Sequence, residues 1–275
     1  QQVGTNCGLI GKNAAVEVDG SAYWMSENGF FRYTGKLESL ACFVEDYVYD
    51  DINTIPKNHI YAGLNNLFGE VTWFYPGSGA ASNNRSVTYN YMDSSPERPV
   101  WTTSSLARST WSDSHIFGKP HATEYVSSGT SDSTVGNTDG ITYYYEHETG
   151  VNSIKDGAAS AISASIQSGD FDISLGQGGG ADLRGDGEYM MKIRRVLPDF
   201  LQQTGDARVT LNLKNYPTDS EASSSLGPFE STTQTTKIDT RARARAISLK
   251  VDNTGTGQHW KLGTFRLDIQ ADGRR

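Results

Sequence analysis

The side chains most able to bind a metal or to transfer a proton are five histidines. They are His59, His115, His121, His147 and His259. None of them belongs to an HExxH pair, the helical spacing that brings two imidazoles to one zinc ion. A proline lies between His115 and His121, which favours a loop over a metal site. The histidine spacing alone therefore predicts no metal centre.

One histidine lies between two acidic residues in "YEHE", residues 145–148. Side chains alternate along a strand, so Glu146 and Glu148 are expected on one face and His147 on the other. A metal at this point would need further ligands from distant parts of the chain. A structural role for His147 is the preferred interpretation.

An acidic cluster in the second half of the chain could bind calcium. Its members are Asp170, Asp172, Asp182, Asp186 and Glu188. Carboxylate oxygens suit calcium, but the spacing differs from the EF-hand loop, whose ligands occupy fixed positions around a glycine. Calcium binding here is the less favoured alternative to a solvated acidic loop.

Motifs for nucleophilic or cofactor chemistry are missing from the sequence. Cys7 has no recognisable Cys-His-Asn neighbourhood, and neither GxSxG nor a P-loop occurs. The run "GQGGG" is not followed by a helix-forming stretch, which a phosphate-binding loop requires. The Ser-x-Asp-x-Gly-x-x-Trp box of sialidase-type propellers is also absent. We therefore assign no catalytic, cofactor-binding or metal-binding residue and do not expect an enzyme.

The elements that would position any site are predicted to be strands. Aromatic residues make up 11% of the 275 residues, and there are 29 glycines. Strand surfaces accommodate aromatic and β-branched side chains, whereas Gly, Asn and Asp favour turns. The sequence thus predicts an all-β protein. Residues 44–52 are the exception, because apolar side chains at helical spacing predict a short helix there.

The pattern of the strands changes close to residue 150 and predicts two domains. Residues 1–153 contain aromatic clusters whose spacing is close to the roughly 40–50 residues typical of a propeller blade, and they predict an incomplete propeller-like domain. Residues 154–275 contain longer strands with one apolar face and predict a β-sandwich-like platform domain. Ile162 and Ile166 are expected on such a face. The polar residues 127–140 predict an exposed loop.

The stretch "AYWMSENGFFRYTG" has an unusual aromatic density for a soluble chain. Aromatic rings bury large areas and pair with one another, which suits a thin blade in which each residue must contribute much packing. The predicted aromatic core comprises Trp24, Phe30, Phe31, Tyr33 and Trp73. A glycan-binding surface built from the same rings is the competing interpretation.

The segment "RARARA", residues 241–246, is the only basic run. Arg241, Arg243 and Arg245 share parity with the apolar positions that follow, so one strand face would change from charged to apolar. Either a bulge changes the register, or the arginines extend beyond the sandwich and contact an acidic partner. An interface role is weighed equally against a solvated edge strand.

Charge and hydropathy exclude several classes of protein. The formal net charge is −8, which disfavours tight nucleic-acid binding because such proteins cluster Lys and Arg. No apolar run approaches the roughly 20 residues of a membrane helix. Two cysteines are too few for a disulfide framework. The first residue is Gln and no signal peptide is recognisable, so we expect a processed product or a fragment.

Several segments together resemble one family of virion proteins. They are "EVDGSAYWMSENGFFRYTGKLESLACFVEDYVYDDIN", "FGEVTWFYP", "NNRSVTYNYMD", "LARSTW", "RARARAISLKV" and "HWKLGTFRLDIQADGRR". In this order they are similar to the tail nozzle of short-tailed bacteriophages, also called tail tubular protein B or packaged-DNA stabilisation protein. The resemblance extends over nearly the whole chain.

The resemblance implies a homohexameric ring at the distal end of the phage tail, with propeller-like and platform parts around a DNA channel. The implied partners are copies of the chain, other tail proteins such as an adaptor, fibre or tip protein, and DNA that passes without tight binding. Six copies would carry a formal charge of about −48, which would keep DNA from adsorbing. The resemblance implies no cofactor and no catalytic residue, and this chain would correspond to a C-terminal portion or a truncated relative.

Two other interpretations stay open. One is a phage adsorption propeller that binds or cleaves glycans, for which paired carboxylates about 5 to 10 Å apart would be expected in a groove. The other is a secreted β-rich adhesion module. A virion ring predicts oligomers without turnover, whereas the glycan protein predicts polysaccharide binding.

Overall fold

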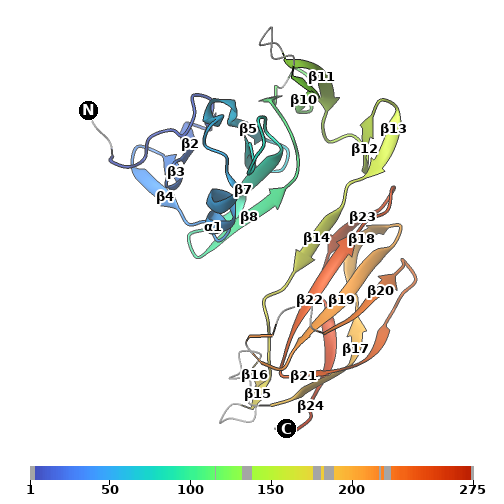
Figure 1. Ribbon diagram of the computed structural model, residues 1–275. Coiled ribbons are helices and arrows are strands. Elements are labelled where there is room, and N and C mark those ends of the chain that lie inside the picture. Colours follow the sequence, from blue (N-terminus) through green and yellow to red (C-terminus); the bar gives the residue numbers. More distant parts are fainter. Residues whose placement is uncertain are drawn as a thin grey trace. The chain divides into compact units, whose positions relative to one another are not determined.

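The protein is described by a computed structural model over residues 4–114, 116–131, 138–175, 181–182, 189–216, 218–219 and 224–273. Nearly all regular structure in these residues is antiparallel strand, which confirms the predicted all-β class. The chain divides into two compact units, residues 1–149 and 150–275, whereas the sequence placed the division between residues 153 and 154. Figure 1 labels most elements of both units.

The first sheet of unit 1 is a meander of four antiparallel strands in sequence order. Its strands are β1 (Ala15–Val18), β2 (Ser21–Ser26), β3 (Gly29–Tyr33) and β4 (Leu37–Leu40). Asp19 and Gly20 connect β1 to β2 with φ angles of 47° and 79°. A two-residue turn with positive φ angles matches the twist of the flanking strands, and Asp-Gly is well suited to it.

The helix predicted at residues 44–52 is confirmed, because α1 spans Glu45–Asp51. Val48 is buried and belongs to the hydrophobic core of unit 1. The hydroxyl of Tyr49 donates to the carbonyl oxygen of Ser26 at 2.7 Å. The same hydroxyl accepts the backbone N–H of Gly29 at 3.1 Å, so the buried Val48 and the hydrogen bonds of Tyr49 to β2 and β3 attach this short helix to the first sheet.

The second sheet of unit 1 follows a short 3-10 helix, η1 (Lys57–His59), and is again a four-stranded meander. Its strands are β5 (Tyr61–Asn65), β6 (Glu70–Tyr75), β7 (Arg85–Ser95) and β8 (Arg98–Ser104). Phe30 of the first sheet is fully buried, with its ring centre 5.0 Å from that of Trp73 and 4.7 Å from that of Trp101. The first two sheets therefore share one aromatic core.

The third sheet of unit 1 has three strands in the order β11-β10-β9. They are β9 (Thr110–Ser112), β10 (His121–Ser131) and β11 (Thr138–Glu146). The prediction of a loop over residues 127–140 is wrong at both ends, where β10 and β11 continue into the polar stretch. Backbone pairing between antiparallel strands does not require apolar side chains. Residues 132–137 lie outside the described part of the chain.

The strand order of the first two sheets is that of propeller blades, each a four-stranded antiparallel meander. The third sheet has one strand fewer. The residues that the structure describes form no closed propeller or barrel. Blade-like sheets are thus present in unit 1 without a closed ring of blades.

Unit 2 contains two larger antiparallel sheets and three two-stranded pairs. One large sheet has the order β14 (Ala164–Gln167), β22 (Ala246–Asn253), β19 (Ala207–Lys214) and β20 (Ser225–Ser231). The other has the order β21 (Ile238–Ala244), β17 (Met191–Leu197) and β24 (Arg266–Ala271). The pairs are β12 (Asn152–Lys155) with β13 (Ala158–Ala161), β15 (Ser174–Leu175) with β16 (Ala181–Asp182), and β18 (Phe200–Thr204) with β23 (His259–Leu262).

The two larger sheets of unit 2 share one hydrophobic core, the arrangement of a β-sandwich. Met191 and Ile193 come from β17, and Val209 and Leu211 come from β19 of the other sheet. All four side chains are fully buried. Their alternation with polar neighbours along each strand is the period of two expected for a sheet with one buried face.

The prediction that Ile162 and Ile166 lie on an apolar face of unit 2 is wrong. Ile162 and Ile166 are 53% and 50% exposed, and every residue of β14 is exposed. β14 is an edge strand paired with β22, and it does not cover the core. Phe171 and Ile173, which follow it, pack against or belong to the core instead. Alternation identified the strand but not its position at the sheet edge.

The chain passes from one large sheet of unit 2 to the other at Arg245, which explains why the arginines of "RARARA" are followed by apolar residues at positions of the same parity. β21 ends at Ala244 in one sheet, and β22 begins at Ala246 in the other. Arg241 and Arg243 are exposed, whereas Ile247 is fully buried. The bend at residue 245 thus reverses the face presented by odd-numbered residues, which accounts for the change from charged to apolar. Contact of the arginines with an acidic partner stays a prediction.

Candidate functional site

Among the residues that the structure describes, no three His, Cys, Asp or Glu side chains are placed to hold a metal ion. Asp170, a member of the predicted calcium cluster, accepts a hydrogen bond from Nζ of Lys214 at 2.7 Å. Asp186, Glu188 and His115 lie outside the described residues. The calcium interpretation is therefore untested.

The most densely connected polar side chains of unit 1 surround Arg108, which is 7% exposed. Its Nε donates to Nε2 of His147 at 2.9 Å, and its Nη1 donates to the carbonyl oxygen of Ala107 at 2.6 Å. Its Cζ lies 4.0 Å from the centre of the Tyr145 ring, a cation–π geometry. Glu124 Oε2 lies 3.9 Å from Nη1 and accepts the Tyr145 hydroxyl at 2.6 Å. These contacts join the segment before β9 to β10 and to the end of β11.

The Arg108 contact fixes the protonation state of His147. A guanidinium has no acceptor, so Nε2 of His147 accepts and the ring proton lies on Nδ1. Burial, then the charges of Arg108 and His121, lower the pKa of His147 to about 4. Burial also lowers the pKa of Arg108, while the charges of Glu124 and Tyr145 act in the opposite direction. His147 is therefore neutral near pH 7 and is no proton donor there.

The sequence singled out His147 but missed its partners. Glu146 and Glu148 are exposed and His147 is half-buried, but β11 ends at Glu146, so the predicted strand does not extend over residues 147–148. The ring of Trp111 covers His147, with their centres 4.5 Å apart. Arg108 lies 39 positions before His147 in the chain, and no local pattern links residues at that separation. We interpret this network as a buried connection between strands.

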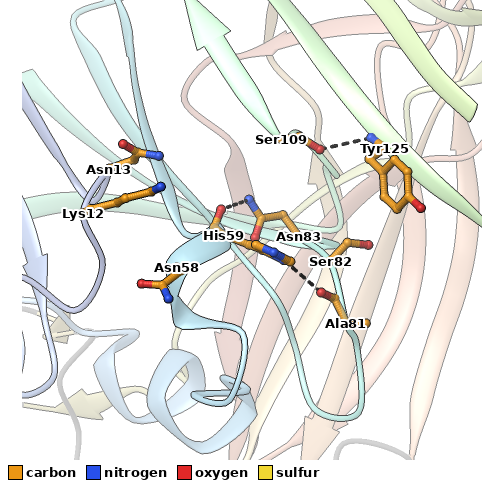
Figure 2. A pocket seen from close by; sticks show the side chains of 9 residues that line it. All are labelled: Lys12, Asn13, Asn58, His59, Ala81, Ser82, Asn83, Ser109 and Tyr125. Atoms are coloured by element: carbon orange, nitrogen blue, oxygen red, sulfur yellow. Dashed lines mark hydrogen bonds between the residues drawn. The ribbon is translucent and has the colours of Figure 1, made fainter. Parts of the chain in front are cut away.

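A cavity of about 580 Å³ opens next to the Arg108 network, within unit 1 (Figure 2). Nine side chains line it, from residues 12–13, 58–59, 81–83, 109 and 125. Eight of the nine are polar, and none is Asp or Glu. The volume falls within the range of small-molecule sites, roughly 300–1,000 Å³. This cavity is the best candidate for a binding site in unit 1.

The side chain of Asn83 is hydrogen-bonded to two other segments at the cavity wall. It is 5% exposed, and its Nδ2 donates to the carbonyl oxygens of His59 at 2.7 Å and of Arg108 at 2.9 Å. Nδ1 of His59 lies 3.0 Å from the carbonyl oxygen of Ala81. The loop containing Asn83, the end of η1 and the Arg108 network are therefore held in fixed positions relative to one another.

The predicted aromatic core divides into two groups. Phe30 and Trp73 are fully buried between the first two sheets. Trp24 and Phe31 pair across β2 and β3, with ring centres 5.8 Å apart, and are half-buried together with Tyr33. Phe30 and Trp73 are therefore core residues, whereas the other three form a partly exposed surface of the first sheet.

The predicted arginine interface also divides. Arg241 and Arg243 project outward from β21, an edge strand of its sheet, while Arg245 is half-buried at the bend. Nε of Arg243 donates to Oδ2 of Asp272 at 2.6 Å. We refer to Arg241 and Arg243 as the arginine row.

No protein-family model matches this chain, and no curated protein matches it. Neither of the two described helices is long and apolar enough to cross a membrane.

Charge is distributed unequally between the units. Unit 1 carries 17 acidic and 8 basic side chains, a net charge of −9, whereas unit 2 carries 15 and 16, a net charge of +1. The arginine row thus belongs to the unit without excess negative charge. The sequence total of −8 concealed this asymmetry.

Helix α1 presents an exposed acidic and aromatic surface on unit 1. Phe43 and Tyr47 are 79% and 56% exposed, and Asp46 and Asp50 are exposed as well. Asp46, Tyr47 and Asp50 belong to α1, where Asp50 lies three or four residues after the other two and so on the same side of the helix, and Phe43 lies two residues before the first helical residue. We refer to these four residues as the α1 patch, which sequence analysis did not identify.

Proposed function

We propose that this protein is a structural subunit of the tail of a short-tailed phage, a nozzle subunit whose copies form a ring around the path of the genome. The observation that carries the proposal is the arginine row on an exposed edge strand, in a chain whose other unit has a net charge of −9. The sequence resemblance supplies the family, and the ring, the virion location and the tail partners follow from it.

The arginine row is suited to contact a protein. Arg241 and Arg243 lie two residues apart on one face, and guanidinium groups bind carboxylates with two parallel hydrogen bonds. Arg243 already donates to Asp272 of its own chain, so a partner carboxylate would have to share or replace that contact. An edge strand also offers unpaired backbone groups to a second chain. Positively charged side chains along an edge strand favour an acidic partner and disfavour pairing with an uncharged strand.

The α1 patch of another copy is the complementary surface that we assign to the arginine row. Asp46 and Asp50 supply carboxylates, and Phe43 and Tyr47 supply rings over which guanidinium groups stack favourably. The two surfaces are different, so contact between copies is head-to-tail. Such contacts produce a closed ring when the rotation between neighbours closes.

The charge of the ring also suits the passage of DNA. The chain has a formal charge of −8, and its basic row would be covered by the neighbouring copy. A surface with excess negative charge repels a polyanion and does not retain it. Genome passage without tight binding is therefore consistent with the composition.

Charge reversal tests this interface directly. Arg241→Glu with Arg243→Glu should abolish rings on size-exclusion chromatography with light scattering, and Asp46→Arg with Asp50→Arg should do the same. Mixing the two variants should restore rings of alternating copies, because each reversed surface then meets its complement. Lys261→Glu with Arg266→Glu changes two exposed charges of unit 2 equally and should leave rings intact. Unchanged rings in the Arg241 and Arg243 variant, or no recovery on mixing, would contradict the proposed interface.

The glycan-cleaving alternative is less well supported. Glycoside hydrolysis uses a pair of carboxyl groups on either side of the scissile bond. None of the nine side chains that line the cavity is acidic. Incubation of the protein with host polysaccharide should therefore release no reducing sugar.

A further inference from the structure

We propose that the cavity of unit 1 binds an acidic saccharide without cleaving it. The site consists of residues 12–13, 58–59, 81–83, 109 and 125. This inference goes beyond the proposed structural role and does not depend on ring assembly. The ligand would be recognised through its own hydroxyl groups and its single negative charge.

The cavity is a preformed site. Its wall at residues 81–83 is attached to η1 and to the Arg108 network by the two hydrogen bonds of Asn83. Oγ of Ser109 accepts the backbone N–H of Tyr125 at 3.0 Å, which fixes the wall formed by β10. A ligand would therefore bind without ordering these loops first, which lowers the entropic cost of binding.

Most of the lining surface is apolar, and the polar groups set into it match the hydroxyl groups of a sugar. Asn13 and Asn58 each offer an amide that donates and accepts, and Ser82 offers a hydroxyl that does both. Sugar hydroxyls also donate and accept, so each can form a pair with such a group. Figure 2 shows Lys12 and Asn13 at one end of the cavity and the Tyr125 ring at the other. An aromatic ring supplies apolar contact for the carbon-bound face of a sugar.

The charge of the lining selects an acidic sugar over a neutral one. Lys12 lines the cavity, no lining residue is acidic, and no described Asp or Glu forms an ion pair with Lys12. The rest of unit 1 is strongly acidic, with 17 acidic and 8 basic side chains. An isolated ammonium in such a unit attracts one carboxylate, while the surrounding charge repels a long polyanion such as nucleic acid.

The lining also explains why binding would not lead to cleavage. A retaining or an inverting glycosidase needs two carboxyl groups at the bond that breaks. The polar groups of the nine lining side chains are amide, hydroxyl, imidazole and ammonium groups. The site therefore holds a sugar and leaves its bonds intact.

Titration of the whole chain with glucuronic acid tests this site, with glucose and inorganic phosphate as comparison ligands. We expect side-chain amide shifts of Asn13 and Asn58 in NMR spectra and a Kd of about 1 mM for glucuronic acid. Glucose should bind about tenfold more weakly. Phosphate should not match the affinity of glucuronic acid, because it lacks the sugar hydroxyl groups.

Two variants and one control locate the binding. Lys12→Gln should weaken glucuronic acid about tenfold and leave glucose unchanged, whereas Asn58→Ala should weaken both sugars severalfold. Lys36→Gln removes an exposed lysine outside the cavity lining and should change neither. Thermal unfolding of each variant confirms that it is folded. The inference is overturned if glucuronic acid does not bind at 20 mM, if phosphate binds equally well, or if both cavity variants bind normally.

Discussion

The buried contact between Arg108 and His147 predicts that unit 1 loses stability in mild acid. The unfolded chain protonates His147 below about pH 6.5, whereas the folded chain, with a pKa of about 4, does not. The unfolded state therefore gains protons first as the pH falls. The contribution of His147 to the free energy of unfolding is therefore fully present above pH 6.5 and decreases progressively as the pH falls toward 4.

The size of the effect follows from the two pKa values. Between pH 8 and pH 5, a group with values of 6.5 unfolded and about 4 folded contributes a loss of roughly 2 kcal/mol. His147 is half-buried, and solvent screening reduces this figure. We expect a loss of about 1–2 kcal/mol in the free energy of unfolding that is attributable to His147.

His147→Gln isolates that contribution. A glutamine oxygen can still accept from Nε of Arg108, but it does not titrate. Unfolding in urea at pH 8 and at pH 5 can be followed by tryptophan fluorescence, which reports mainly on unit 1 because four of the five tryptophans lie there. The wild type should lose about 1–2 kcal/mol more than the variant between the two pH values.

His259→Gln is the matched control, because His259 is an exposed histidine of unit 2. It should keep the pH dependence of the wild type. If His147→Gln also loses as much stability as the wild type between pH 8 and pH 5, His147 is not held neutral by burial and Arg108, and the reasoning fails.

Two further predictions concern packing and the thiols. Phe30→Ala should lower the free energy of unfolding by about 3–5 kcal/mol, because Phe30 is fully buried. Phe31→Ala, at a half-buried position, should lower it by about 1–2 kcal/mol in the same urea experiment. Similar losses for the two variants would contradict the division between core and surface. Cys42 is a free thiol whose pKa burial raises to about 11, so alkylation at pH 8 should be about 100-fold slower than for a free cysteine peptide. Mass spectrometry of a Cys7→Ser variant measures that rate, and labelling as fast as the peptide would contradict a buried thiol.

The fold class could be predicted because strands leave a local signal. Val209 and Leu211 alternate with polar neighbours, and this alternation placed them correctly in the sandwich core. The same signal failed at Ile162 and Ile166, because alternation does not tell an edge strand from a central one. It also failed at residues 127–140, where backbone hydrogen bonds extend β10 and β11 without apolar side chains.

The candidate site could be predicted only in part, because its residues meet across long stretches of the chain. Arg241 and Arg243 were found from a local run of charge, and their exposure agrees with an edge strand. Asn83 contacts residues 24 and 25 positions away, and neither contact leaves a local pattern. The cavity and the Arg108 network required the tertiary structure for that reason.

Electron microscopy of the purified, unmodified chain at physiological salt tests the central proposal most directly. Each chain has a mass of 30.0 kDa, and the account predicts closed rings of about six copies with a central opening. Particles of a single chain at every concentration examined, with no ring among them, would contradict it.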